Sequence, residues 1–233
     1  MPYMSVIIPA LNEQKYIKYP IDGLKKQTFR DFETIVVDGG SEDRTRSIAR
    51  KHAKVTVALR KGVAAGRNKG AVVSRGKILV FIDADTKPSR ALLATYADAF
   101  KDKRVVAATG PIYPLEKTSR RIRLGYGFVS VPFVKLSILL GRPSIVGSNF
   151  AVRTESFIKA GGFDPKLITY EDWDLSMRLK KFGKIVYLDD AVVHTSARRI
   201  VAWGVWGYLL YYVINMFMYT FLKRARKNYT EIR

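Results

Sequence analysis

The stretch Gly76–Pro88, GKILVFIDADTKP, decides the fold. Its uncharged run Ile78–Ile82 is rich in strand-forming residues and is too short for a helix. It therefore predicts a strand buried on both faces, as in a parallel sheet. Asp83 and Asp85 follow with one residue between them, and side chains at i and i+2 of an extended chain point the same way. We expect two convergent carboxylates at the carboxyl end of a central strand.

These two carboxylates, in a D-x-D pattern, have two explanations. Open α/β sheets bind ligands in the crevice beyond the carboxyl ends of their strands. Mg2+ is typically held by one or two carboxylates together with phosphate oxygens. A divalent metal carrying a substrate phosphate would therefore offset the repulsion between Asp83 and Asp85. Alternatively, the aspartates only end the strand, because aspartate is common in turns.

The composition excludes several classes of site. The 233 residues suffice for one large domain or two small ones. The absence of cysteine excludes disulfides and thiolate metal sites, and two histidines, His52 and His194, are too few for a histidine-rich zinc site. The first residues, MPYMSVIIPALNE, lack the features of a signal peptide. The net charge of +21 predicts an anionic partner, which could be nucleic acid, a phosphorylated substrate or acidic lipid.

Strands and helices alternate along residues 1–110. This alternation is typical of a parallel sheet with helices on both faces. Ser41 or Asp43 is placed to cap the helix after the second strand, and Pro88 stands at the start of the helix 89–100. The expected strands are 5–8, 32–37, 55–59, 78–82 and 105–110, and the expected helices are 13–27, 62–74 and 89–100.

After Gly110 the pattern becomes less regular. We expect a strand within 144–153, a helix with Thr154 as its N-cap, and closing strands at 184–188 and 191–194. A further helix runs from Glu171 to about Phe182, and acidic residues crowd its first turn.

Several motifs, spread over about residues 4–197, carry a resemblance to a known family. In chain order they are VIIPALNE, VVDGGSEDRT, GRNKGA before FIDADT, GSNFAVR, GGFDP and YEDWDLSMRL. The chain resembles the family 2 glycosyltransferases, inverting enzymes of the GT-A fold. The resemblance implies an α/β fold with a mostly parallel, Rossmann-like central sheet. Residues 1–110 would bind the nucleotide-sugar, residues 111–197 the acceptor, and residues 198–233 would form a membrane-associating hydrophobic helix and a basic tail.

The resemblance also implies which residues bind the donor. Asp38 would accept a hydrogen bond from a ring N–H of the base, and Arg67 would approach the base or the diphosphate. Asp83 would face the ribose, while Arg198 and Arg199 would meet the diphosphate or lipid headgroups. The alternatives are that Asp38 caps a helix and that Arg67 is a solvated helix charge. The remaining residues expected to line the base and ribose are Pro9, Asn12 and Glu13.

The same resemblance assigns a divalent metal, Mg2+ or Mn2+, to Asp85 and Asp83. Such a metal acts as a Lewis acid that neutralises the departing nucleoside diphosphate. His194 would complete the metal shell, and an imidazole ligand suits Mn2+ better than Mg2+. A buried, hydrogen-bonded histidine is the alternative for His194.

The second acidic cluster supplies the expected catalytic residues. Transfer with inversion needs a carboxylate that takes the proton of the attacking hydroxyl. The resemblance gives this role to Asp172, with Glu171 positioning the acceptor or sharing the role. Acids in a first helical turn also complement the helix dipole, and this alternative would account for Asp174.

The uncharged segment Ile200–Leu222 predicts membrane attachment. As a helix it would be about 35 Å long, enough to cross a bilayer. A crossing would leave the basic tail on the far side, against the positive-inside rule, whereas scattered aromatics with basic flanks favour a helix lying in the interface. Burial against the domain or a dimer partner is the third alternative. We expect the protein at the cytoplasmic face of the cell membrane, on an acidic surface.

The predicted function is therefore transfer of a sugar from a nucleotide-sugar, with UDP favoured over GDP, to a hydroxyl or phosphate of an acceptor. The apolar stretch Phe128–Leu140 favours a lipid-linked acceptor or glycan. A nucleic-acid-binding protein is disfavoured, because the acids would converge on one cleft and repel phosphates. A sugar nucleotidyltransferase would want a glycine-rich loop with a basic residue where this chain has PALNE. A binding module without activity is the last alternative.

Overall fold

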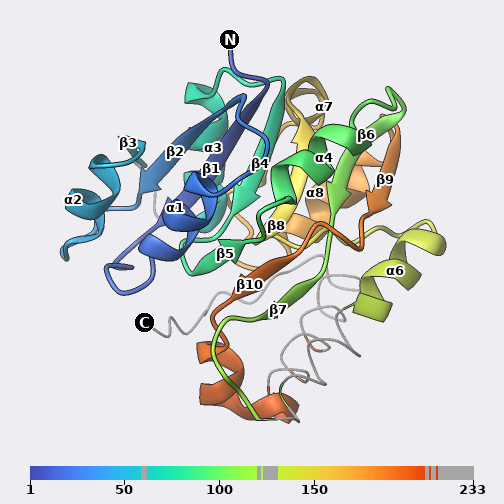
Figure 1. The fold of residues 1–233 in the computed structure, drawn as a ribbon. Coiled ribbons are helices and arrows are strands. Elements are labelled where there is room, and N and C mark those ends of the chain that lie inside the picture. Colours follow the sequence, from blue (N-terminus) through green and yellow to red (C-terminus); the bar gives the residue numbers. More distant parts are fainter. Residues whose placement is uncertain (59–61, 120–121, 123–130, 208–209, 211–213, 215–233) are drawn as a thin grey trace.

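The computed structural model describes residues 1–58, 62–119, 122, 131–207, 210 and 214, and it confirms the α/β fold with a mostly parallel central sheet. Its strands are β1 (Met4–Ala10), β2 (Phe32–Asp38), β3 (Lys54–Val57), β4 (Ile78–Ile82), β5 (Thr86–Pro88), β6 (Val105–Thr109), β7 (Ile112–Pro114), β8 (Asn149–Arg153), β9 (Lys184–Tyr187) and β10 (Val193–Thr195). Figure 1 shows a seven-stranded sheet of order β3-β2-β1-β4-β8-β6-β9 and a three-stranded sheet of order β5-β10-β7. In the larger sheet β8 is antiparallel to both neighbours, and the other neighbouring strands are parallel.

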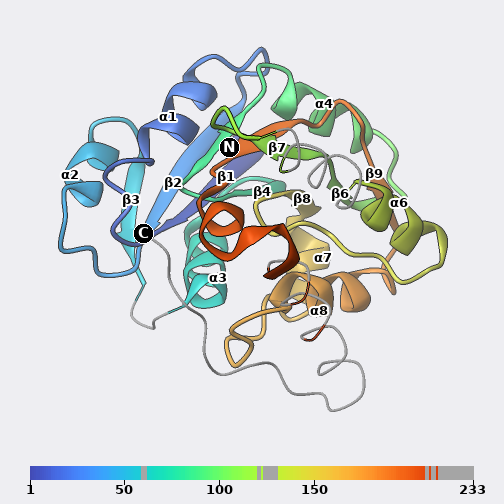
Figure 2. The ribbon, with the colours of Figure 1, turned by 90° about the horizontal axis from the view of Figure 1, so that it is seen from below.

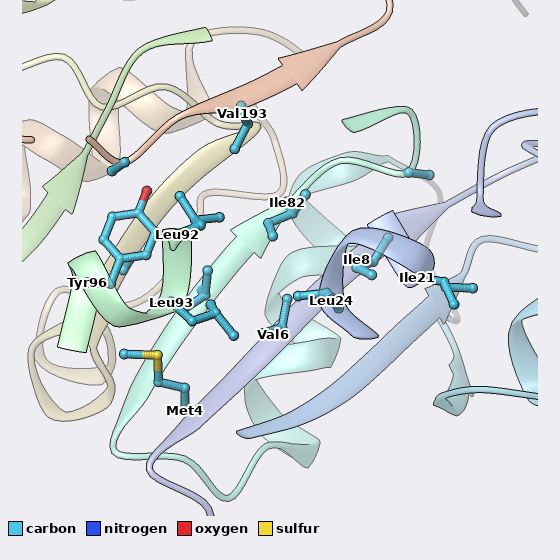
Figure 3. Close-up of a cluster of buried hydrophobic side chains, with 14 of the residues drawn as sticks. Met4, Val6, Ile8, Ile21, Leu24, Ile82, Leu92, Leu93, Tyr96 and Val193 are labelled. Atoms are coloured by element: carbon cyan, nitrogen blue, oxygen red, sulfur yellow. The ribbon is translucent and has the colours of Figure 1, made fainter. Parts of the chain in front are cut away.

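Helices cover both faces of the larger sheet. They are α1 (Lys18–Lys25), α2 (Thr45–Arg50), α3 (Val63–Val73), α4 (Leu92–Ala99), α6 (Val131–Leu139), α7 (Thr154–Lys159) and α8 (Glu171–Leu179). One core joins Val6 and Ile8 of β1 to α1 and α4 (Figure 3), and a second core joins Ile7 to α3, α7 and α8. Because alternate residues of a strand enter different cores, β4 needs apolar residues at every position.

The parallel strands β1, β2 and β4 end at the same edge of the sheet. Ala10, the last residue of β1, pairs with Asp38, the last residue of β2, and β4 ends immediately before Asp83. The loops that follow these strands therefore start side by side. This edge is where the sequence places its candidate donor and metal residues.

The structure corrects the predicted start of two helices. The helix expected at 13–27 is shorter, because residues 14–17 form turns and α1 begins at Lys18. Pro88 does not open a helix: it ends β5, which pairs with β10, and α4 begins only at Leu92. Proline suits a short edge strand of this kind, because an edge strand can do without one N–H donor.

The two capping predictions have different outcomes. Thr154 lies inside α7, where Arg153 takes the N-cap position, and the Thr154 hydroxyl donates to the Gly76 carbonyl at 2.7 Å, so this prediction is wrong. Arg44 stands in the N-cap position of α2, but the Asp43 carboxylate accepts from the Thr45 N–H at 2.9 Å. Asp43 therefore bonds the first N–H of α2, as the sequence predicts for a capping residue.

The predicted membrane segment Ile200–Leu222 lies mostly outside the described residues. Its first part, residues 200–207, belongs to a helical segment that starts at residue 198. Within the described ranges, no helix has the length and apolar character that a bilayer crossing requires.

Candidate active site

Arg67 on α3 joins acidic groups from the two halves of the chain. Its Nη2 donates to Asp83 Oδ1 at 2.9 Å, and its Nη1 donates to Glu171 Oε1 at 3.0 Å. The residue is only 2% exposed, and its Cζ lies 5.3 Å from the centre of the Phe163 ring. Since Asp83 follows β4 and Glu171 opens α8, one buried guanidinium links the end of a central strand to the start of a helix.

This geometry changes the interpretation of Arg67. The sequence leaves it either near the donor or on a solvated helix face, and the structure instead buries it between two carboxylates. Gly147 leaves the space for it, because a Cβ at this position would lie 2.8 Å from Arg67 Nη2. Close packing against Gly147 therefore restricts the position of the guanidinium.

Asp172 lies next to this buried pair and accepts hydrogen bonds from backbone N–H groups. Gly147 donates to its Oδ2 at 3.0 Å and Trp173 donates to its Oδ1 at 2.8 Å. Burial raises the pKa of Asp172, although the Arg67 charge and these N–H donors oppose the shift. Burial and the Asp172 charge likewise raise the pKa of Glu171. Carboxyls with raised pKa values are better proton acceptors than exposed ones.

The backbone before α8 is held in an uncommon conformation. Tyr170 has φ +67°, and in the described part of the chain Asn12 is the other non-glycine residue with positive φ. Left-handed residues of this kind cost free energy and gather at functional sites. Tyr170 directly precedes Glu171 and Asp172 in the first turn of α8, and Asn12 belongs to the loop after β1.

Asp85 belongs to a second cluster, built around Arg198. Arg198 Nη2 lies 3.1 Å from Asp85 Oδ2, and the same guanidinium donates to both oxygens of Glu13 at 2.9 and 2.5 Å. The Thr195 hydroxyl donates to Asp85 Oδ1 at 3.2 Å. Burial and the neighbouring Asp83 charge raise the pKa of Asp85 to about 6, and Arg198 and Arg199 only partly oppose them. The structure thus brings together five predicted residues: Glu13, Asp83, Asp85, Arg198 and Arg199.

The residues at this edge fit a divalent cation. Burial first, and the Asp83 charge second, raise the pKa of Asp85 although Arg198 lies 3.1 Å from it, so the nearby arginines do not offset the cost of two neighbouring carboxylates, whereas a bound cation would. Among the residues that the structure describes, no three His, Asp or Glu side chains stand close enough to hold a metal ion by themselves. Asp83 and Asp85 would therefore hold Mg2+ or Mn2+ together with oxygens of a phosphate, the arrangement that Mg2+ favours.

His194 does not join these aspartates. It lies on β10 between Lys87 of β5 and Tyr113 of β7, and its ring centre is 6.0 Å from that of Tyr113. Side chains alternate along a strand, so the neighbouring Thr195 faces Asp85 and His194 faces the other way. Burial and the Lys87 charge lower the pKa of His194. The predicted three-residue metal shell is thus not assembled.

Asp38 is fully buried in its own loop. Its carboxylate accepts from the N–H groups of Gly40 and Ser41 and from the Arg46 guanidinium, whose Nη2 lies at 2.6 Å. Burial acts against the charged form, but these donors outweigh it and lower the pKa of Asp38. A base could reach this carboxylate only if the half-exposed Arg46 moved, so contact between Asp38 and the base stays a prediction.

The loops after β1 and β2 are bound to each other. The Asn12 N–H donates to Ser41 Oγ at 2.9 Å, and the Glu42 N–H donates back to Asn12 Oδ1 at 2.9 Å. Pro9 lies beside α3, since a Cβ on Gly66 would be 3.3 Å from its own. The loops after β1 and β2 therefore form one structure that Asn12 holds together, while Pro9 lies in β1 itself.

Sequence reasoning missed three residues of this region. Thr195 contacts Asp85, Arg46 closes the Asp38 loop, and Asn68 bonds both backbone groups of Phe163 at 2.8 and 2.9 Å. Asn68 lies inside the motif GRNKGA, which was the available signal for it.

Comparisons with known sequences place the chain in one family. The family profile described as Glycosyl transferase family 2 matches residues 5–161. The probable glycosyltransferase YdaM of Bacillus subtilis is 26% identical over 255 residues, which cover 97% of this chain and 60% of YdaM. The uncharacterized glycosyltransferase EpsJ of the same organism is 35% identical over 98 residues, 40% of this chain and 28% of EpsJ. The chain thus spans less than two thirds of the length of these relatives.

Solved structures show the same fold at low identity. The mannosyltransferase PcManGT from Pyrobaculum calidifontis, in complex with GDP-Man and Mn2+, has a TM-score of 0.73 at 20% identity and covers 97% of this chain and 65% of that one. S. aureus TarS 1-349 in complex with UDP-GlcNAc has a TM-score of 0.67 at 22% identity, over 85% of this chain and 59% of that one. These neighbours have the GT-A fold. With a family match over more than half of its residues, this chain belongs to glycosyl transferase family 2.

Proposed function

We propose that this protein is an inverting glycosyltransferase that moves a sugar from a nucleoside-diphosphate donor, UDP in preference to GDP, to a hydroxyl or phosphate of an acceptor. The observation that carries the proposal is the pair of acidic clusters joined by Arg67: Asp83 at the end of β4 and Glu171 at the start of α8. Family membership supports the reaction class, and neighbours solved with UDP-GlcNAc or GDP-Man support the donor class.

The donor side is proposed to lie at the ends of β1, β2 and β4. Asp83 and Asp85 would hold Mg2+ or Mn2+ with the diphosphate, as the Mn2+ in the PcManGT complex suggests. When bound, the metal supplies Lewis-acid stabilisation of the negative charge on the departing diphosphate. Arg198 and Arg199 add positive charge beside Asp85, so the chain itself contributes to binding the same phosphates.

Asp172 is proposed as the group that takes the proton of the attacking acceptor. Its two oxygens accept from the backbone N–H groups of Gly147 and Trp173, which leave it free of an ion pair with Arg67. Glu171 Oε1 instead accepts from the Arg67 guanidinium, and this ion pair suits a residue that positions the site. The raised pKa of Asp172 suits a proton acceptor.

A binding and turnover experiment tests the donor side. UDP and GDP are titrated into the full chain with and without Mn2+ or Mg2+, and UDP- and GDP-sugars are then supplied with membrane lipid extract. We expect metal to strengthen nucleotide binding in the wild type. Asp85→Ala should lose this gain, while Asp98→Ala, an exposed aspartate on α4, should keep it. Metal-dependent binding that survives in Asp85→Ala would remove Asp85 from the donor site.

A further inference from the structure

The helix α6 is apolar on its outer face as well as on its inner face. Val134 is buried against the domain, whereas Phe133, Leu136 and Leu139 are exposed, Leu139 by 81%. Residues 133, 136 and 139 are three positions apart, so each is a neighbour of the next on the helix surface. A helix that is apolar all round is normally buried on all sides. The outer face of α6 therefore has the composition of a surface that packs against further apolar groups.

The helical residues 198–207 repeat this arrangement. Ile200 is buried in the core that includes β1 and α1, while Val201 and Trp206 are exposed, Trp206 by 84%. A large aromatic ring that is almost fully exposed is uncommon on a soluble surface, whereas tryptophan is enriched where a bilayer meets water. Both elements lie in the lower half of Figure 1, and both are therefore on the near side of the molecule in Figure 2, which is seen from below.

The charge around these apolar faces has one dominant sign. Between Lys117 and Arg142 the sequence has basic residues and no acidic one, and the chain as a whole carries +21. Arg142 is exposed after α6, and Lys135 on the helix is paired with Asp189 at 2.6 Å. Apolar side chains surrounded by cations complement an anionic lipid surface, since the cations meet the headgroups while the apolar groups leave water.

We propose that α6 and the helical residues 198–207 form one docking surface for an anionic lipid bilayer. Phe133, Leu136 and Leu139 enter the headgroup region from α6, and Trp206 enters it from the second element. The docking goes beyond the sugar-transfer proposal and does not depend on it. It also places the active edge beside the bilayer, because Arg198 opens the helical segment and contacts Asp85.

The test measures binding of the full chain to vesicles by co-sedimentation. One set of vesicles is phosphatidylcholine alone and the other contains phosphatidylglycerol in equal part. We expect the wild type to pellet with the anionic vesicles and much less with the neutral ones. The double variant Leu136→Glu/Leu139→Glu should lose at least about tenfold in apparent affinity, since each leucine no longer leaves water. Trp206→Glu should show a loss of similar size.

Matched controls come from exposed apolar residues on other elements. Val72 on α3 is 79% exposed and Ile158 on α7 is 69% exposed. Val72→Glu and Ile158→Glu make the same chemical change and should bind like the wild type. Unchanged thermal unfolding in all four variants would exclude misfolding as the cause.

Three results would overturn the proposal. The first is a wild type that ignores anionic vesicles. The second is an equal loss of vesicle affinity in the α6 variants and the controls. That result would mean that net charge alone drives the binding, so that nucleic acid would be as good a partner as lipid. The third is a wild-type dimer, seen by analytical ultracentrifugation, that Leu136→Glu/Leu139→Glu converts to a monomer without changing vesicle binding. That result would assign the surface to a second copy of this chain.

Discussion

Replacing Arg67 by methionine should destabilise the protein in a way that depends on Glu171. Arg67 is buried between Asp83 and Glu171, and methionine keeps much of its volume but not its charge. Removing one partner of a buried ion pair costs about 3–5 kcal/mol, because the other charge is left unpaired. The Asp83 side chain is 33% exposed and keeps water, whereas that of Glu171 is 11% exposed. We therefore expect the lower end, about 3 kcal/mol, mostly from Glu171.

The pH dependence has a defined sign. Burial and Asp172 already raise the pKa of Glu171, and Arg67 opposes them. Without Arg67 the folded pKa rises further, so Glu171 keeps a proton that the unfolded chain has lost. The folded state then binds more protons than the unfolded state, and stability falls as the pH rises from 4.5, the ordinary value, through the folded pKa. The loss in Arg67→Met should be largest in mildly alkaline buffer and smaller in acid.

Urea unfolding of Arg67→Met, Glu171→Gln and the double variant measures this coupling. Arg67→Met/Glu171→Gln should recover most of the stability lost in Arg67→Met, because a neutral amide tolerates the uncharged neighbour. The interaction free energy from the double-mutant cycle should be at least about 1 kcal/mol. The buried ion pair between Arg67 and Glu171 would be refuted if the free energy of unfolding of Arg67→Met lay within about 0.5 kcal/mol of that of the wild type. It would also be refuted if the double variant were no more stable than Arg67→Met.

Three further stability changes follow from the same contacts. Gly147→Ala should lower the free energy of unfolding in urea by about 1–3 kcal/mol, since the new Cβ would press on Arg67. The control Gly207→Ala should cost little, because the nearest atom to its Cβ would be 3.6 Å away. Equal costs in the two variants would contradict the close approach of Gly147 to Arg67. Asp85→Asn should stabilise the protein by about 2–3 kcal/mol at neutral pH. The pKa of Asp85 is raised to about 6 in the folded state, so the free energy of unfolding of the wild type falls as the pH rises from 3.8 to about 6, and the variant should lack this fall. A variant that keeps this pH dependence would exclude Asp85 as its source. Asn149→Leu should lower the free energy of unfolding by about 3 kcal/mol, because the Tyr96 hydroxyl and the carbonyls of Pro111 and Ala191 lose their hydrogen-bond partner. A loss below about 1 kcal/mol would show that water replaces the amide.

The sequence predicts those parts of the fold that depend on local pattern. The uncharged run of β4 is readable because a strand buried on both faces needs apolar side chains throughout, and the structure confirms it between two cores. The acids after β4 and at the start of α8 could be placed from the local sequence pattern, and the structure confirms both positions. Their association could not be predicted in this way, since Arg67 and Glu171 are 104 residues apart.

Short elements account for most of what sequence reasoning could not resolve. β5 and β10 have three residues each, so period-two alternation is too brief to show which side chain faces the site. The family resemblance predicts His194 as a metal ligand, whereas in the structure Thr195 contacts Asp85. Asp38 and Thr154 are comparable cases, because polar side chains near a helix start bond whichever donor or acceptor the tertiary structure brings close.

The central claim is that Asp172 takes a proton from the acceptor, and turnover by Asp172→Asn beside Asp174→Asn tests it most directly. Both aspartates lie in the first turn of α8, but Asp174 is bonded to Arg178 in the same helix. With a donor sugar and acceptor identified by the lipid-extract screen, kcat of Asp172→Asn should fall by about 10²–10⁴, with nucleotide binding unchanged. Asp174→Asn should turn over at nearly the wild-type rate. Equal rates in the two variants would contradict the proposed base.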